Sequence, residues 1–160
     1  MKKILTSLFF AMILSIPAYS QVVKLEQVFG DRVSQTYLSF HKHLEGDTTE
    51  NPVFSLWGFQ RYDESWIIAY EVEYFKGSAT EMFHFLNEVV AFAEKYQNES
   101  GILTVISEVK VKTAYQTSPR YTQVFDPDGK VCCQFRYREW NRILDDFKMF
   151  CEKNAIQYRN

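Results

Sequence analysis

The clearest pattern of hydrophobic and polar positions lies between Ser65 and Gln97, where an alternating segment precedes a helical one. Residues 66–75 alternate between large apolar and polar side chains, which is typical of a β-strand with one buried face. Burying Glu71 and Glu73 unpaired would be costly, so the opposite parity is predicted to face the core. That core set is Trp66, Ile68, Tyr70, Val72 and Tyr74.

The segment that follows predicts an amphipathic helix with a defined start. Ser78 and Glu81 have the spacing of a capping box, in which each residue satisfies a backbone N–H of the other. We expect Gly101 to mark the stop. Apolar residues then recur at helical spacing, and they form the predicted buried stripe: Met82, Phe85, Leu86, Val89, Val90, Phe92 and Ala93.

Two further strands are predicted before this unit. In residues 33–44, Leu38, Phe40 and Leu44 share one side, whereas Tyr37, Ser39, His41 and His43 share the other. Residues 53–62 form the next strand, which the Asp63–Glu64 connection joins to the strand at 66–75. Residues 21–29 fit a short strand or a first helical turn equally well, so periodicity leaves them open.

The C-terminal half repeats this order of strands and a helix. Residues 102–114 are predicted to form one long strand, and residues 121–125 and 131–137 a hairpin closed by a type I turn at Asp126–Gly129. A final helix is predicted over 137–155. On the long strand, Leu103, Val105, Val109 and Val111 form the apolar side, while Ile106 lies among the polar set of Thr104, Glu108, Lys110 and Lys112.

These elements predict a two-layer α+β sandwich in which a mostly antiparallel sheet of about six strands has two helices on one face. Residues 85–95 and 143–153 align with shared Leu, Phe, Glu and Lys positions. The two halves, residues 33–98 and 102–155, therefore read as a possible duplicated βββα unit. Amphipathic helices resemble one another in any case, so chance similarity stays open beside duplication.

Residues 1–20 predict a cleaved Sec-type signal peptide of the bacterial kind. Lys2 and Lys3 precede the apolar run 4–16, and Ala18 and Ser20 supply the small residues of a cleavage site. The run is too short to span a bilayer, and no later segment is apolar enough to do so. We therefore expect one exported domain over 21–160, in the periplasm or outside the cell.

Charge argues against nucleic acid as the partner. The chain carries 18 basic and 20 acidic residues without a basic run, whereas nucleic-acid binding requires a basic patch. Aromatic residues make up 17% of the chain, which is enough to fill a core and to supply a binding surface as well.

The three cysteines include a candidate disulfide. Cys133 has the inward parity of its strand and Cys151 lies in the apolar stripe of the last helix, so the pair is interpreted either as a disulfide or as two buried thiols. A bridge closing such a loop would stabilise the fold by roughly 3 kcal/mol. Cys132 has the outward parity and is expected to be an exposed, inert thiol.

No motif in the chain predicts a cofactor or a metal. His41 and His43 project from one side of a strand, but a third ligand is not evident, and His84 falls on the exposed side of its helix. Asp126–Gly129 lacks the distal ligands of a calcium loop. The chain has no nucleophile elbow, phosphate loop or dinucleotide fingerprint.

The predicted binding surface is the sheet face opposite the helices. Trp57 and Phe59 lie on this side if Phe54 and Leu56 take the core side. An open face of charges and aromatic residues suits a protein, peptide or other ligand of the cell envelope, and a solvated sheet face is the alternative. The residues assigned to this surface are Trp57, Phe59, Glu71, Glu73, Lys110 and Arg136, with Glu108, Lys112 and Gln134 beside them.

The sequence therefore predicts an exported, non-enzymatic binding protein. The alternative is an exported hydrolase with a histidine–carboxylate or thiol site. That alternative requires a deep pocket in which His41, His43 or Cys132 meets a carboxylate.

Overall fold

The structure is a computed structural model, and it describes residues 23–31, 36–43, 52–60, 70–115 and 120–159. The predicted leader at 1–20, the Asp63–Glu64 connection, and Leu44, Trp66 and Ile68 of the predicted core lie outside these ranges. For His43 and Phe59 only the backbone is described.

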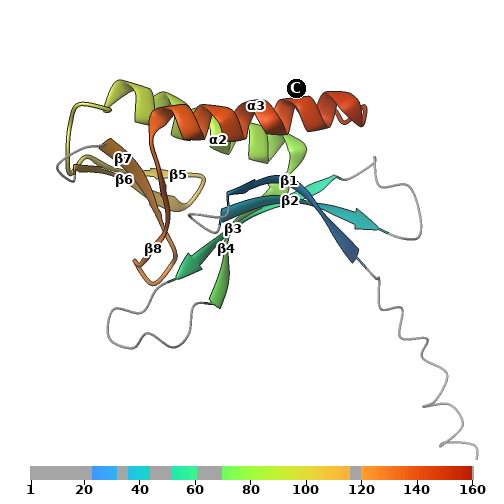
Figure 1. Ribbon diagram of the computed structural model, residues 1–160, viewed down its shortest axis with the longest axis horizontal. Helices are drawn as coiled ribbons and strands as arrows, with labels where there is room; N and C mark the ends of the chain where they lie inside the picture. Colours follow the sequence, from blue (N-terminus) through green and yellow to red (C-terminus); the bar gives the residue numbers. More distant parts are fainter. Residues whose placement is uncertain (1–22, 32–35, 44–51, 61–69, 116–119, 160) are drawn as a thin grey trace, which may run out of the picture.

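The described chain forms two antiparallel sheets of four strands, and each sheet is followed by a helix (Figure 1). The first sheet has the order β1(Val23–Asp31), β2(Thr36–His43), β3(Val53–Gln60), β4(Tyr70–Ser78), and helix α2(Ala79–Lys95) follows it. The second has the order β5(Leu103–Ile106), β6(Val109–Tyr115), β7(Arg120–Phe125), β8(Val131–Phe135), and helix α3(Tyr137–Lys153) follows it.

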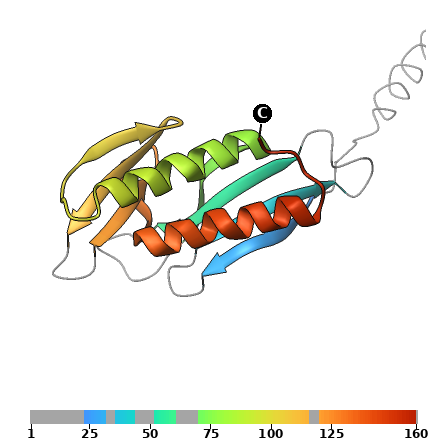
Figure 2. The ribbon, with the colours of Figure 1, turned by 90° about the horizontal axis from the view of Figure 1, so that it is seen from above.

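The helices form one layer and the sheets form the other, which confirms the two-layer α+β architecture. Seen from above, α2 and α3 lie side by side over the sheets and run in opposite directions (Figure 2). The prediction of one sheet of six strands is wrong, because the strands form two sheets of four. Periodicity left residues 21–29 open, and from Val23 onward they belong to the edge strand β1 of the first sheet.

The extra strand of the second sheet arises from a turn inside the predicted strand at 102–114. Ser107 and Glu108 both have positive φ angles, 46° and 69°, as the two central residues of a type I′ hairpin do. The chain reverses there, so that Ile106 pairs with Val109. Glu108 therefore lies in a turn and not on the sheet face, and Gly101 does not end α2, whose last helical residue is Lys95.

A register shift changes which residues of β4 enter the core. The pairing of β3 with β4 slips between Leu56 and Trp57. As a result both Tyr74 and its neighbour Phe75 pack inward, Tyr74 buried and Phe75 stacked on Phe85 of α2 at 4.3 Å between ring centroids. Of these two neighbours, alternation along the strand assigned Tyr74 to the core and Phe75 to the opposite face. Glu71 and Glu73 are exposed as predicted.

The start of α2 is also as predicted. The Ser78 N–H donates to the Glu81 carboxylate at 2.7 Å, and the Glu81 N–H donates to the Ser78 hydroxyl at 3.3 Å. The predicted stripe of α2 is buried throughout. At α3, the Glu139 carboxylate accepts a hydrogen bond from the backbone N–H of Arg136 at 2.7 Å, which satisfies one terminal backbone group in the same way.

Helix α3 spans both sheets and joins them into one core. Near its start, Trp140 is fully buried against Phe135 of β8, and its indole N–H donates to the Thr122 carbonyl at 3.3 Å. About two turns later, Phe147 contacts Phe54 of β3 with centroids 5.0 Å apart.

Within the described residues, no helix is long and apolar enough to cross a membrane.

Candidate functional site

Three side chains form a row across the outer face of the first sheet, which is the face away from the helices. Trp57 of β3 is the pairing partner of Tyr37 on β2 and of Glu73 on β4. Partners in adjacent antiparallel strands point to the same face, with Cβ atoms about 5 Å apart. The register therefore puts a phenol, an indole and a carboxylate next to one another.

Glu71 extends this row to a second carboxylate. The Tyr37 hydroxyl donates to Glu71 Oε1 at 3.4 Å, a long hydrogen bond. Burial of the phenol, followed by the negative charge of Glu71, raises the pKa of Tyr37, so this hydroxyl stays a donor at neutral pH. Glu71 and Glu73 are exposed, whereas Tyr37 is half-buried. We call Tyr37, Trp57, Glu71 and Glu73 the acidic–aromatic face.

Trp57 is half-buried, and its Nε1 is a buried donor without a hydrogen-bond partner in the described structure. A buried indole N–H usually finds an acceptor, so Trp57 Nε1 is an exception to that rule. Phe59 pairs with Glu71 through the backbone. Its side chain lies outside the described structure, so its place on this face stays a prediction.

Lys110 and Arg136, which sequence reasoning assigned to the same surface, belong to the second sheet. Lys110 lies on β6 between Val105 and Phe125. Arg136 follows β8, with its guanidinium carbon 5.9 Å from the centre of the Tyr121 ring. The predicted surface is thus divided between two sheets, acidic on the first and basic on the second.

The second sheet also exposes two aliphatic residues that sequence reasoning assigned to its apolar side. Leu103 is 60% exposed and Val105 is 61% exposed, whereas Ile106 is buried. The assignment fails because the turn at Ser107–Glu108 reverses the chain, so β5 pairs with β6 in the register that puts Ile106 inward. The signal was present in Ile106, the apolar residue among the polar set.

All three cysteines are free thiols, and all are buried. The expectation that Cys132 is exposed is wrong, because β8 has a register shift at this residue and both Cys132 and Cys133 are enclosed. Burial raises the pKa of the Cys132 thiol to about 12. A thiol with such a pKa is protonated at neutral pH and is a poor nucleophile.

Cys133 and Cys151 lie in different parts of the core. The Cys133 thiol donates to the Tyr74 hydroxyl at 3.3 Å, and burial raises the pKa of both groups. Cys151 stands on α3 about 16 Å along the helix axis from Trp140, the residue that packs beside β8. A disulfide needs Cα atoms within about 7 Å. Of the two interpretations of Cys133 and Cys151, the structure therefore has two buried free thiols and not a disulfide.

The histidines do not form a metal site within the described part of the chain. His41 is half-buried and its Nε2 lies 2.7 Å from the Ser55 hydroxyl oxygen, while His84 is exposed on α2. No group of three or more His, Cys, Asp or Glu side chains gathers there. Ser55 is itself fully buried, so the His41–Ser55 pair does not present a hydroxyl to a substrate.

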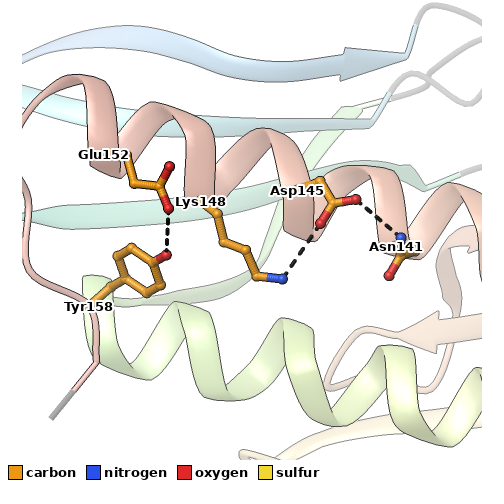
Figure 3. Close-up of polar contacts among 5 residues, drawn as sticks. All are labelled: Asn141, Asp145, Lys148, Glu152 and Tyr158. Carbon is orange, nitrogen blue, oxygen red and sulfur yellow. Dashed lines mark hydrogen bonds and ion pairs between the residues drawn. The ribbon is translucent and has the colours of Figure 1, made fainter.

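Polar side chains on α3 satisfy one another along the helix (Figure 3). Asp145 accepts from the Asn141 amide at 3.1 Å and lies 3.5 Å from the Lys148 ammonium, and the Tyr158 hydroxyl donates to Glu152 at 3.3 Å. A cavity of about 300 Å³ lies at the C-terminal end of α3. Its lining consists of Cys151, Glu152, Ala155, Ile156, Gln157, Tyr158 and Arg159. Its lining includes neither His41 nor Cys132.

Asp126–Gly129 is the predicted hairpin turn. The Gly129 N–H donates to the Asp126 carbonyl at 3.0 Å, and the Lys130 N–H donates to the Asp126 carboxylate at 2.8 Å. Asp126 is buried, so its carboxylate stabilises the turn.

Comparison of the chain with protein-family models, with curated proteins and with solved structures finds no match.

Proposed function

We propose that this protein is an exported, non-enzymatic binding protein, and that its acidic–aromatic face recognises a positively charged segment of a protein or peptide. The observation that carries the proposal is the row of Tyr37, Trp57 and Glu73 across three adjacent strands, with Glu71 beside it. Export itself is supported by the leader pattern of residues 1–20.

The chemistry of the row suits a lysine or arginine side chain. Exposed carboxylates at Glu71 and Glu73 attract a cation, and the face of an indole or phenol ring attracts it further through the ring quadrupole. Aromatic residues also contribute most of the binding energy in many interfaces. A strand-borne row is rigid, so little entropy is lost when the partner binds.

The test is a pull-down with the mature protein, residues 21–160, from envelope and secreted fractions. Wild type is compared with Trp57→Ala and with Glu73→Lys, which reverses one charge of the row. We expect both variants to lose the captured partner. We also expect capture by the wild type to weaken as salt is raised, because exposed charges are screened.

The matched control is Glu94→Lys, which makes the same charge change at an exposed position of α2. It should retain the partner, and melting curves of all three variants should show that each is folded. Equal capture by wild type, Trp57→Ala and Glu73→Lys would show that this face is not the binding surface.

A further inference from the structure

Strand β5 differs from the other edge strands in carrying no charged residue that would hinder pairing. Natural edges carry charges, prolines or covering elements that prevent a further strand from adding. Charged residues occupy β1 at Lys24 and Glu26 and β4 at Glu71 and Glu73, and β8 packs against β3. The sequence of β5 is LTVI, with no charged residue and no proline.

The backbone of β5 also presents hydrogen-bonding groups at its open side. Ile106 and Val109 flank a two-residue turn, so they form a hydrogen-bonded pair. Because such pairs alternate with non-hydrogen-bonded ones, the amide groups of Leu103 and Val105 point away from β6. Figure 2 shows the β5–β6 hairpin at the outer border of the second sheet, with β5 outermost.

The side chains beside this edge define the chemistry of an occupant. Leu103 and Val105 are the two exposed aliphatic residues of β5 on the outer face. Their pairing partners on β6 are Lys112 and Lys110, both exposed. A cationic border behind an aliphatic edge is complementary to a strand that carries aliphatic residues at its centre and carboxylates at its ends.

We propose that the open edge of β5 binds an extended acidic peptide segment, which adds to the second sheet as a fifth strand. The backbone groups of Leu103 and Val105 pair with it, their side chains contact two of its aliphatic residues, and Lys110 and Lys112 attract its carboxylates. This is the mode of β-strand addition seen in peptide-binding domains. The inference concerns the second sheet and is independent of the acidic–aromatic face.

A second copy of the chain fits this edge less well. Pairing two β5 strands about a twofold axis would bring the lysines of both copies onto one face, without a carboxylate to balance them. It would also join the copies through only four residues each, which is less than the contact of about 1,000 Å² that a specific dimer needs.

The probe is a synthetic peptide with the sequence Glu-Thr-Val-Thr-Val-Thr-Glu, acetylated and amidated, titrated into isotopically labelled mature protein and followed by backbone amide NMR shifts. Alternate residues share a face, so both valines meet Leu103 and Val105. We expect shifts confined to β5 and β6, and at least a tenfold weaker affinity after Lys110→Glu with Lys112→Glu. Lys24→Glu on β1 is the matched control and should bind as wild type does.

The decisive variant is Val105→Pro, which removes one outward N–H donor. Proline is tolerated at edge positions whose N–H faces solvent, so the protein should stay folded while peptide binding is lost. The proposal is overturned if Val105→Pro binds the peptide normally, or if the same peptide with lysine in place of glutamate binds equally well. It is also overturned if the protein alone sediments as a dimer that Val105→Pro makes monomeric.

Discussion

The backbone of Cys132 lies directly against Gly58, and this contact is where the two sheets meet. A Cβ on Gly58 would stand 3.0 Å from the carbonyl carbon of Cys132 and closer still to its carbonyl oxygen. Contacts of that kind are backbone contacts and do not relax by rotation of a side chain. Strand β8 can therefore cross β3 at this point because residue 58 has no side chain.

Gly58→Ala is expected to destabilise the fold by about 1–3 kcal/mol, the usual cost of inserting a methyl group into a packed core. The free energy of unfolding in urea measures the change. Gly101→Asn is the control, because Gly101 has nothing within 4 Å of its Cβ position and asparagine tolerates its positive φ of 82°. A Gly58→Ala protein as stable as Gly101→Asn would mean that β8 does not approach β3 this closely.

The capping box should make α2 sensitive to acid. Hydrogen bonds from the backbone and side chain of Ser78 lower the pKa of Glu81 below its ordinary 4.5. A lowered pKa in the folded state means that the stabilisation is present above about pH 4.5 and is lost as pH falls through the folded value. Ser78→Ala should cost about 1 kcal/mol at neutral pH.

Thermal unfolding at neutral and acidic pH measures this contribution. Glu81→Gln should lower the melting temperature at neutral pH and reduce its fall on acidification, whereas Glu88→Gln, on the exposed face of the same helix, should leave both unchanged. If Glu81→Gln and Glu88→Gln had equal effects, the cap would contribute nothing measurable.

The buried thiols predict a loss of stability in alkaline solution. Burial raises the pKa of Cys132 and of Cys151 from 9.0 to about 12. The unfolded chain therefore releases these protons first, so stability is complete below about pH 9 and falls between about pH 9 and about pH 12. Each such thiol lowers the free energy of unfolding by at most about 1.4 kcal/mol per pH unit in this range.

Urea unfolding across this pH range tests the slope, and Cys151→Ala should make it shallower. The native protein should also resist alkylation at all three cysteines, with full reaction only after unfolding. Rapid labelling of one thiol in the native protein, or a mass difference between oxidised and reduced samples, would contradict the free buried thiols of the structure.

The turn at Ser107–Glu108 is a place where the fold can be improved. Neither serine nor glutamate favours positive φ, whereas Asn-Gly is the preferred pair for a type I′ turn. Ser107→Asn with Glu108→Gly should raise the free energy of unfolding by about 1 kcal/mol. Ser107→Val should lower it, because a β-branched residue is strained there. A loss of stability in the Asn-Gly variant would argue for a continuous strand at 102–114.

Local features of this fold could be predicted from the sequence because they depend on residues close together in the chain. The capping box of Ser78 and Glu81 spans three residue steps, the Asp126–Gly129 turn spans four residues, and the stripe of α2 repeats every helical turn. The outward direction of Glu71 and Glu73 followed from the cost of burying a charge. Each of these was confirmed.

Features that depend on pairing between distant segments were decided by the tertiary structure. Alternation continues through Ser107 and Glu108 except at Ile106, and one apolar residue out of phase does not show that the chain reverses there and builds a second sheet. The register shifts that turn Phe75 inward and enclose Cys132 arise only when each strand is fitted to its partner. The row of Tyr37, Trp57 and Glu73 likewise joins three strands, and the burial of two helices against two sheets fixes which strands are neighbours.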